Sequence, residues 1–76
     1  MENKENLKKK FAENLKQLRA RKAISIRELA LRANLEYSQV QRIEKGKVNL
    51  SLTTIISLAD GLDLHPRKLL DFDWNN

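Results

Sequence analysis

Residues 25–46 constrain the fold most strongly, because they read as two short amphipathic helices joined by a tight turn. The first helix places small or aliphatic residues on one face, and these are Leu29, Ala30 and Ala33. The second places Val40 and Ile43 on one face and long polar side chains on the opposite face. The pattern therefore predicts two packed helices, one of which presents a polar surface.

Helical spacing of apolar residues continues on both sides of this segment. An amphipathic helix is predicted at about 5–21 from Leu7, Phe11, Leu15 and Leu18. A fourth helix, capped by Ser51 and broken near Gly61 and Asp63, carries Leu52, Ile55, Ile56, Leu58, Ala59 and Leu62. A short fifth helix starts at Pro66, with Leu69 and Leu70 facing inward. The chain is therefore predicted to be all-α, a compact five-helix bundle in a single domain over 1–76 with its core within 7–70.

The ends of the two central helices carry recognisable signals. Ser25 can cap the second helix, and Glu28 three residues later would complete a capping box. Asn34 stands at the turn, where asparagine tolerates a left-handed backbone better than most residues. The third helix is expected to run over about 37–45 and to stop at Gly46.

The composition argues against several kinds of site. The 76 residues hold no cysteine and one histidine, His65, which is expected to cap or decorate the fifth helix. Neither a disulfide nor a zinc site is expected, and no nucleophile–base pair or Gly-rich phosphate loop can be assembled. We therefore expect no enzyme activity, no metal and no cofactor. No apolar run approaches the roughly 20 residues that span a bilayer, so we expect a cytoplasmic protein without a membrane partner.

The net charge of +5 is unevenly distributed. Residues 1–47 carry 13 Lys or Arg and 6 Asp or Glu, whereas residues 48–76 carry 2 and 4. A basic half beside a mildly acidic half suits a protein that turns one face toward a polyanion. Lysines that only keep a small domain soluble, such as the run at 8–10 on the first helix, would give similar totals. Charge alone therefore leaves both interpretations open.

The polar face of the third helix favours the polyanion interpretation. At 100° per residue one side of this helix carries Tyr37, Ser38, Gln41, Arg42 and Lys45. These side chains have the donors, acceptors and flat surfaces that read base edges in the major groove of DNA. Arg42 can take guanine bidentately, Gln41 can take adenine, and Tyr37 can touch a thymine methyl group or a phosphate. We therefore predict base contacts from Tyr37, Ser38, Gln41 and Arg42.

With these residues in place, the chain resembles the XRE-type helix-turn-helix proteins, the family of phage Cro and repressor proteins. The resemblance spans 8–70 and rests on Leu15-x-x-Leu18-Arg19, Ser25-x-x-Glu28-Leu29-Ala30, Leu35, Val40, Ile43-Glu44-Lys45-Gly46-Lys47, Leu52, Leu58-Ala59 and Leu62. It implies a lambda-repressor-like fold whose second and third helices form the motif over 25–46. The helix at 37–45 would then lie in the major groove, and Arg19 would form a partly buried ion pair with Glu44.

The same resemblance implies a sequence-specific transcriptional regulator, a homodimeric repressor on an approximately palindromic operator of double-stranded DNA. Phosphate contacts are expected near helix ends and in the loop after the third helix, from Ser25, Arg27, Lys45, Lys47 and Asn49. The chain departs from the family pattern at four positions, which are Ile26, Asn34, Glu36 and Leu50. At the first of these the family often has a glutamine that contacts a phosphate and braces the recognition helix. Either the adjacent Arg27 or the backbone amide at the start of the second helix can substitute for it.

A second function class stays open. An antitoxin-like or adaptor protein would act mainly through contacts with a toxin or another protein partner. The aromatic tail keeps this alternative open, because Phe72 and Trp74 can either fold back on the core or form part of a dimer contact.

Overall fold

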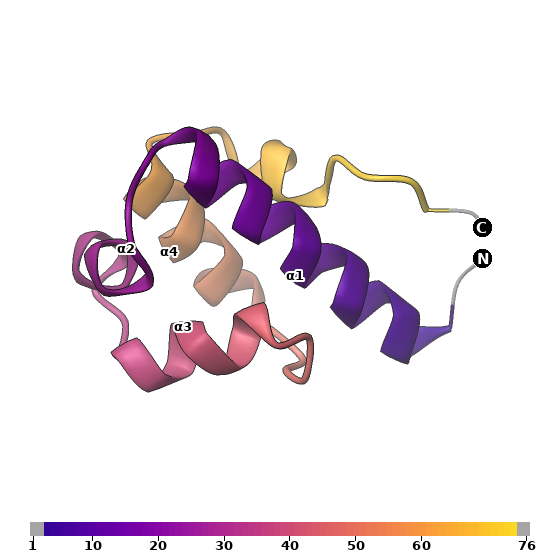
Figure 1. The fold of residues 1–76 in the computed structure, drawn as a ribbon. Coiled ribbons are helices and arrows are strands. Elements are labelled where there is room, and N and C mark those ends of the chain that lie inside the picture. Colours follow the sequence, from indigo (N-terminus) through magenta and orange to yellow (C-terminus); the bar gives the residue numbers. More distant parts are fainter. Residues whose placement is uncertain (1–2, 75–76) are drawn as a thin grey trace.

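The computed structural model describes residues 3–74, and this part of the chain is helical and contains no β-strand. Its elements are α1 (Lys4–Arg21), α2 (Ile26–Ala33), α3 (Tyr37–Glu44), α4 (Leu52–Leu62) and the 3-10 helix η1 (Pro66–Leu70). Figure 1 shows α1 crossing the molecule, with the N-terminal part of the chain and the C-terminal tail at the same end. The all-α prediction is confirmed. The fifth helix is a 3-10 helix, a form that proteins use in such short pieces.

Both predicted serine caps are present. The Ser25 hydroxyl accepts a hydrogen bond from the Glu28 N–H at 3.0 Å, and the Ser51 hydroxyl accepts one from the Thr54 N–H at 3.2 Å. The Glu28 carboxylate accepts a hydrogen bond from Arg32 Nε, one turn further along α2, at 2.9 Å. The capping-box prediction was therefore wrong for Glu28, because an ion pair at spacing i, i+4 engages its side chain.

Left-handed residues end the central helices. Asn34 closes α2 with φ 57° and ψ 42°, and Gly46 follows α3 with φ 74°, so both expected turns are present. Helix α3 ends at Glu44 with Lys45 as its C-cap, one residue earlier than predicted. Ala23, in the connector before α2, also has a positive φ of 58°, which the sequence pattern did not indicate.

The core lies where all five elements converge. Its buried hydrophobic residues are Phe11, Ala12, Leu15, Leu18, Leu29, Ala30, Ala33, Val40, Ile43, Leu58, Ala59, Leu62 and Leu69. Partly buried side chains from the connectors, such as Ile24, Leu35 and Leu50, pack against this cluster. The predicted apolar stripes of α1, α2 and α3 therefore supply the core as expected, and they fix α3 with its polar face outward.

Helix α4 and η1 have more apolar residues than their packed faces can bury. Leu52 is 72% exposed, and Ile56 and Leu70 are each 40% exposed. The prediction that Leu70 faces inward was wrong, because Leu69 occupies the inward position of η1. Among residues 3–74, however, no helix is both long and apolar enough to cross a membrane.

Gly61 lies in the last turn of α4 and is buried, and the helix ends near Gly61 and Asp63 as predicted. The helix continues to Leu62 and is closed by Asp63, whose φ of 56° is left-handed. A Cβ atom added at Gly61 would lie 3.0 Å from both the backbone nitrogen and the Cβ of Ala33. Glycine is therefore used here to bring α4 close to α2.

Replacing Gly61 by alanine is expected to lower the free energy of unfolding by about 1–3 kcal/mol through overpacking against α2. Helix propensity alone predicts the opposite sign, a gain of about 1 kcal/mol. The matched control is Asp60→Ala on the exposed side of α4, where the same propensity argument applies without a steric conflict. Urea denaturation of both variants shows whether overpacking or helix propensity dominates at Gly61. A Gly61→Ala variant that is more stable than the unmodified protein would contradict the close approach of α4 to α2.

The C-terminal tail folds back along α1. Asn14 Nδ2 donates to the carbonyl oxygens of Lys68 and Leu69 at 2.9 and 3.0 Å. Further along, Lys10 Nζ donates to the Asp73 carbonyl oxygen at 2.7 Å. Lys10 is thus engaged with the tail, although the run at 8–10 was expected on the solvated face of the first helix.

Candidate DNA-binding surface

Helix α3 is anchored on one side and open on the other. Val40, Ile43 and Glu44 are its buried residues, and they pack between α1 and α2. The outward side presents the four side chains predicted to contact bases: Tyr37, which is 38% exposed, the exposed Ser38 and Arg42, and the partly buried Gln41. Figure 1 shows α3 at the lower edge of the molecule, where this side meets no other helix.

A bidentate ion pair ties α3 to α1. Arg19 Nε donates to Glu44 Oε2 at 2.7 Å, and Arg19 Nη2 donates to Glu44 Oε1 at 2.9 Å. Arg19 Nη1 also donates to the carbonyl oxygen of Ile24 at 2.9 Å, which links the connector before α2 to the same pair. The expected pair is therefore formed, and it joins three segments.

Burial makes this ion pair consequential. The Glu44 side chain is 4% exposed and that of Arg19 is 20% exposed, so water cannot replace the partner of the carboxylate. The hydrogen bonds to Glu44 raise the pKa of Arg19 above its ordinary value; burial opposes this shift and the negative charge of Glu44 adds to it. The guanidinium group therefore stays charged and compensates the buried carboxylate.

The first turn of α3 lacks a side-chain cap. Glu36 occupies the N-cap position and makes no capping hydrogen bond, as its departure from the family pattern predicted. The turn is supported instead from α2, because the guanidinium carbon of Arg27 lies 4.5 Å from the centre of the Tyr37 ring. Ile26 is partly buried and packs against the core. The sequence offered one signal for this contact, which is an arginine next to the position where the family often has glutamine.

The residues predicted to contact phosphates lie at two ends of this surface. Ser25 and Arg27 are exposed at the start of α2, although the Ser25 oxygen is engaged as the cap of that helix. Lys45, Lys47 and Asn49 are exposed after the end of α3. Both groups flank the outward side of α3, an arrangement that suits positioning contacts on a nucleic-acid backbone.

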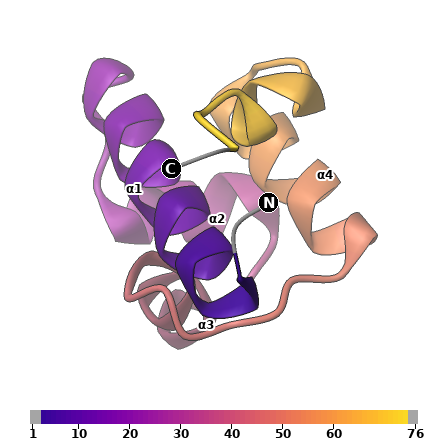
Figure 2. The ribbon, with the colours of Figure 1, turned by 90° about the vertical axis from the view of Figure 1, so that its right-hand side faces the viewer.

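The loop after α3 is seated against the start of α1. A Cβ atom added at Gly46 would lie 3.2 Å from the Lys9 Cα, so this turn approaches the α1 backbone closely. Figure 2 shows the segment that joins α3 to α4 passing beneath the first turns of α1. The loop that carries Lys47 and Asn49 is therefore held by packing on α1.

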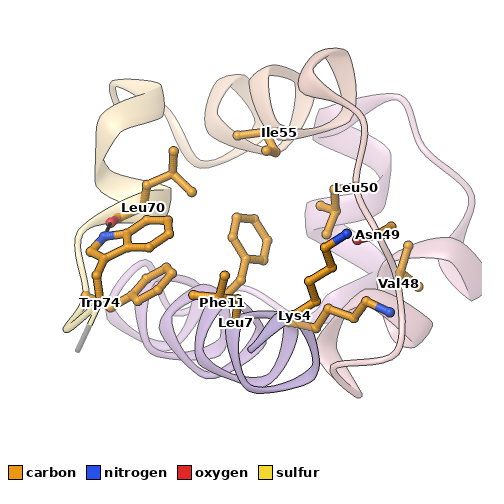
Figure 3. Close-up of a pocket in the computed structure, with 11 residues that line it drawn as sticks. Lys4, Leu7, Phe11, Val48, Asn49, Leu50, Ile55, Leu70 and Trp74 are labelled. Carbon is orange, nitrogen blue, oxygen red and sulfur yellow. Dashed lines mark hydrogen bonds between the residues drawn. The ribbon is translucent and has the colours of Figure 1, made fainter. Parts of the chain in front are cut away.

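An apolar groove of about 300 Å³ lies between this loop and the C-terminal tail. Figure 3 shows Leu70 and Trp74 on one side, Val48 and Leu50 on the other, and Phe11 between them. The Phe72 and Trp74 rings stack with their centres 4.7 Å apart, and Trp74 Nε1 donates to the Leu70 carbonyl oxygen at 3.0 Å. Of the two arrangements considered for the tail, the structure shows the fold-back.

Comparison with known proteins adds independent findings. A family model described as helix-turn-helix matches residues 15–69. The chain is 32% identical over 68 residues to the control protein C.BamHI of Bacillus amyloliquefaciens, a match that covers 88% of this chain and 84% of that protein. The crystal structure of the restriction-modification controller protein C.AhdI from Aeromonas hydrophila superposes with a TM-score of 0.79 at 40% identity. That match covers 82% of this chain and 94% of the other.

Proposed function

This chain belongs to the helix-turn-helix family of DNA-binding transcriptional regulators, and we propose that it binds an approximately palindromic operator as a homodimeric repressor. The outward side of α3 carries the proposal, because it presents Tyr37, Ser38, Gln41 and Arg42 on a helix fixed by a buried ion pair. Since both similar proteins are described as control or controller proteins, we further propose that this chain regulates restriction–modification genes in the cytoplasm.

In this proposal the two kinds of contact have separate tasks. Gln41 and Arg42 hydrogen-bond to base edges in the major groove, and Tyr37 and Ser38 contact the bases nearest the start of α3. The exposed Ser25, Arg27, Lys45, Lys47 and Asn49 bind phosphates and set the position of the domain on the duplex. Each neutralised phosphate makes the affinity fall more steeply with salt.

The homodimer requires a second surface, and α4 offers one. We define the α4 face as Leu52 and Ile56, which lie one turn apart on the same side of the helix and are 72% and 40% exposed. Ile55, which precedes Ile56, lines the groove together with Leu70 and Trp74, so the α4 face continues into an apolar region. In a dimer formed through this face, the two α3 helices would have to lie about 34 Å apart to enter successive major grooves.

Selection of bound sequences from random double-stranded DNA tests the proposal as a whole. The expected result is a gapped, approximately palindromic sequence whose half-sites are one helical turn apart. Failure to enrich any sequence at moderate salt would contradict the proposal. It would favour the alternative of an antitoxin-like or adaptor protein that acts through a toxin or another protein partner.

The separate replacements Gln41→Ala and Arg42→Ala test the assignment of base contacts. Each is expected to weaken binding to the selected operator by about 1–3 kcal/mol and to relax preference at one position in each half-site. The control is Lys47→Ala, which should weaken binding to all sequences alike. It should also reduce the slope of log affinity against log salt concentration by about one. Operator titrations at several salt concentrations measure both effects, and unchanged affinity in both α3 variants would refute their role.

A further inference from the structure

The contact between Arg27 and Tyr37 joins two residues to which the proposed function gives separate tasks. The guanidinium group lies over the ring at 4.5 Å from its centre, on the exposed side of both helices. Tyr37 is the first residue of α3, and Arg27 is the second residue of α2. The contact therefore crosses the turn of the motif at the point where α3 begins.

The Arg27 contact is one support of the Tyr37 side chain, which also lines a shallow surface hollow with Ser25 and Ile26. Glu36 provides no side-chain cap at the start of α3, and Ile26 is turned toward the core. The guanidinium group lies over the ring, and Tyr37 is 38% exposed, so part of its surface remains for a ligand. An aromatic ring held in this way suits apolar contact with a methyl group.

We propose that Arg27 is a positioning residue that holds Tyr37 against the methyl group of a thymine in the operator. The pair, and not Tyr37 alone, then determines discrimination at that base. This inference rests on the proposed function, because it needs an operator that α3 reads. In this inference Arg27 orients the Tyr37 ring, a role that a positive charge contacting a phosphate does not fulfil.

Replacing each operator thymine in turn by uracil removes only the methyl group and supplies the test. For the unmodified protein we expect one position in each half-site at which this change weakens binding, by about fourfold for one buried methyl group. Arg27→Lys keeps the charge but loses the planar group that stacks on the ring. This variant should bind the thymine operator about two- to fivefold more weakly and should no longer distinguish thymine from uracil at that position.

Three further variants separate positioning from other roles. Tyr37→Ala should also lose the discrimination, and adding Arg27→Lys to it should cause no further loss. Tyr37→Phe keeps the ring and should retain the discrimination. Arg32→Lys is the matched control, because Arg32 lies on α2 and pairs with Glu28. Circular dichroism and thermal unfolding of each variant check that the fold is intact.

The outcomes distinguish this inference from the proposed function. If Arg27→Lys keeps both its affinity and its discrimination, Arg27 acts only as a charge and the inference is overturned. If the unmodified protein binds its operator but no thymine-to-uracil change matters, the inference is also overturned while the proposed function stands. If no sequence is selected at all, the proposed function itself has failed.

Discussion

Replacing Arg19 by methionine is expected to lower the free energy of unfolding by about 3–5 kcal/mol, because the variant leaves the buried Glu44 carboxylate without a partner. It also removes the hydrogen bond to the Ile24 carbonyl oxygen, which holds the connector before α2. For a protein of this size the loss is a large part of the total stability. Urea denaturation followed by circular dichroism measures it.

A second replacement separates the buried charge from the lost packing. The double variant Arg19→Met/Glu44→Leu removes both charges and is expected to regain most of the stability, since apolar pairs often replace buried ion pairs without loss. Arg21→Met, at the exposed end of α1, controls for the change of side chain and should be close to neutral. Exposed ion pairs contribute less than about 1 kcal/mol to stability. If Arg19→Met lowers the free energy of unfolding by no more than this, the result would contradict the burial of the pair.

Introducing charge on the α4 face is expected to have the largest effect on operator binding. The double variant Leu52→Glu/Ile56→Glu places like charges opposite each other in the proposed dimer, so it should be monomeric. A monomer engages one half-site at a time and loses the effective concentration that links two sites, which lowers affinity by about 10²–10⁴-fold. Analytical ultracentrifugation and operator titration measure the two consequences separately.

The exposure of these residues makes the experiment specific. Leu52 and Ile56 lie outside the buried core, so the monomeric fold should survive the substitution, which thermal unfolding can check. Leu31 on α2 is 76% exposed and lies outside the α4 face, so Leu31→Glu is expected to remain dimeric. A dimer that persists in the α4 variant would show that the subunits pair through another surface.

The elements of this fold could be predicted because their signals are local. The signals are the helical spacing of apolar residues, the serine caps and the left-handed Asn34. Each involves residues within one or two helical turns, so each can be recognised directly in the sequence. The pair of Arg19 and Glu44 is separated by 25 positions, and it was expected only through the family resemblance. Spacing alone placed Glu44 on the buried side without naming its partner.

The features that were missed depend on contacts between elements. From the sequence alone, Gly61 signals the end of a helix. In the structure it also lets α4 approach α2 closely. Leu69 and Leu70 are equally apolar, and only the path of η1 decides which one is buried. Similarly, the stacking of Arg27 on Tyr37 depends on the angle between α2 and α3. The spacing of apolar residues in the sequence does not determine this angle.

The placement of the aromatic residues gives the chain two separate optical reporters. Its single tryptophan, Trp74, stacks on Phe72 beside the apolar groove, and its single tyrosine, Tyr37, stands at the start of α3. Trp74 emission excited at long wavelength therefore follows events at the tail and the groove, whereas Tyr37 signals follow events at the DNA-binding surface. Occupation of either surface can thus be recorded in one unlabelled sample, without adding a dye to a protein of 76 residues.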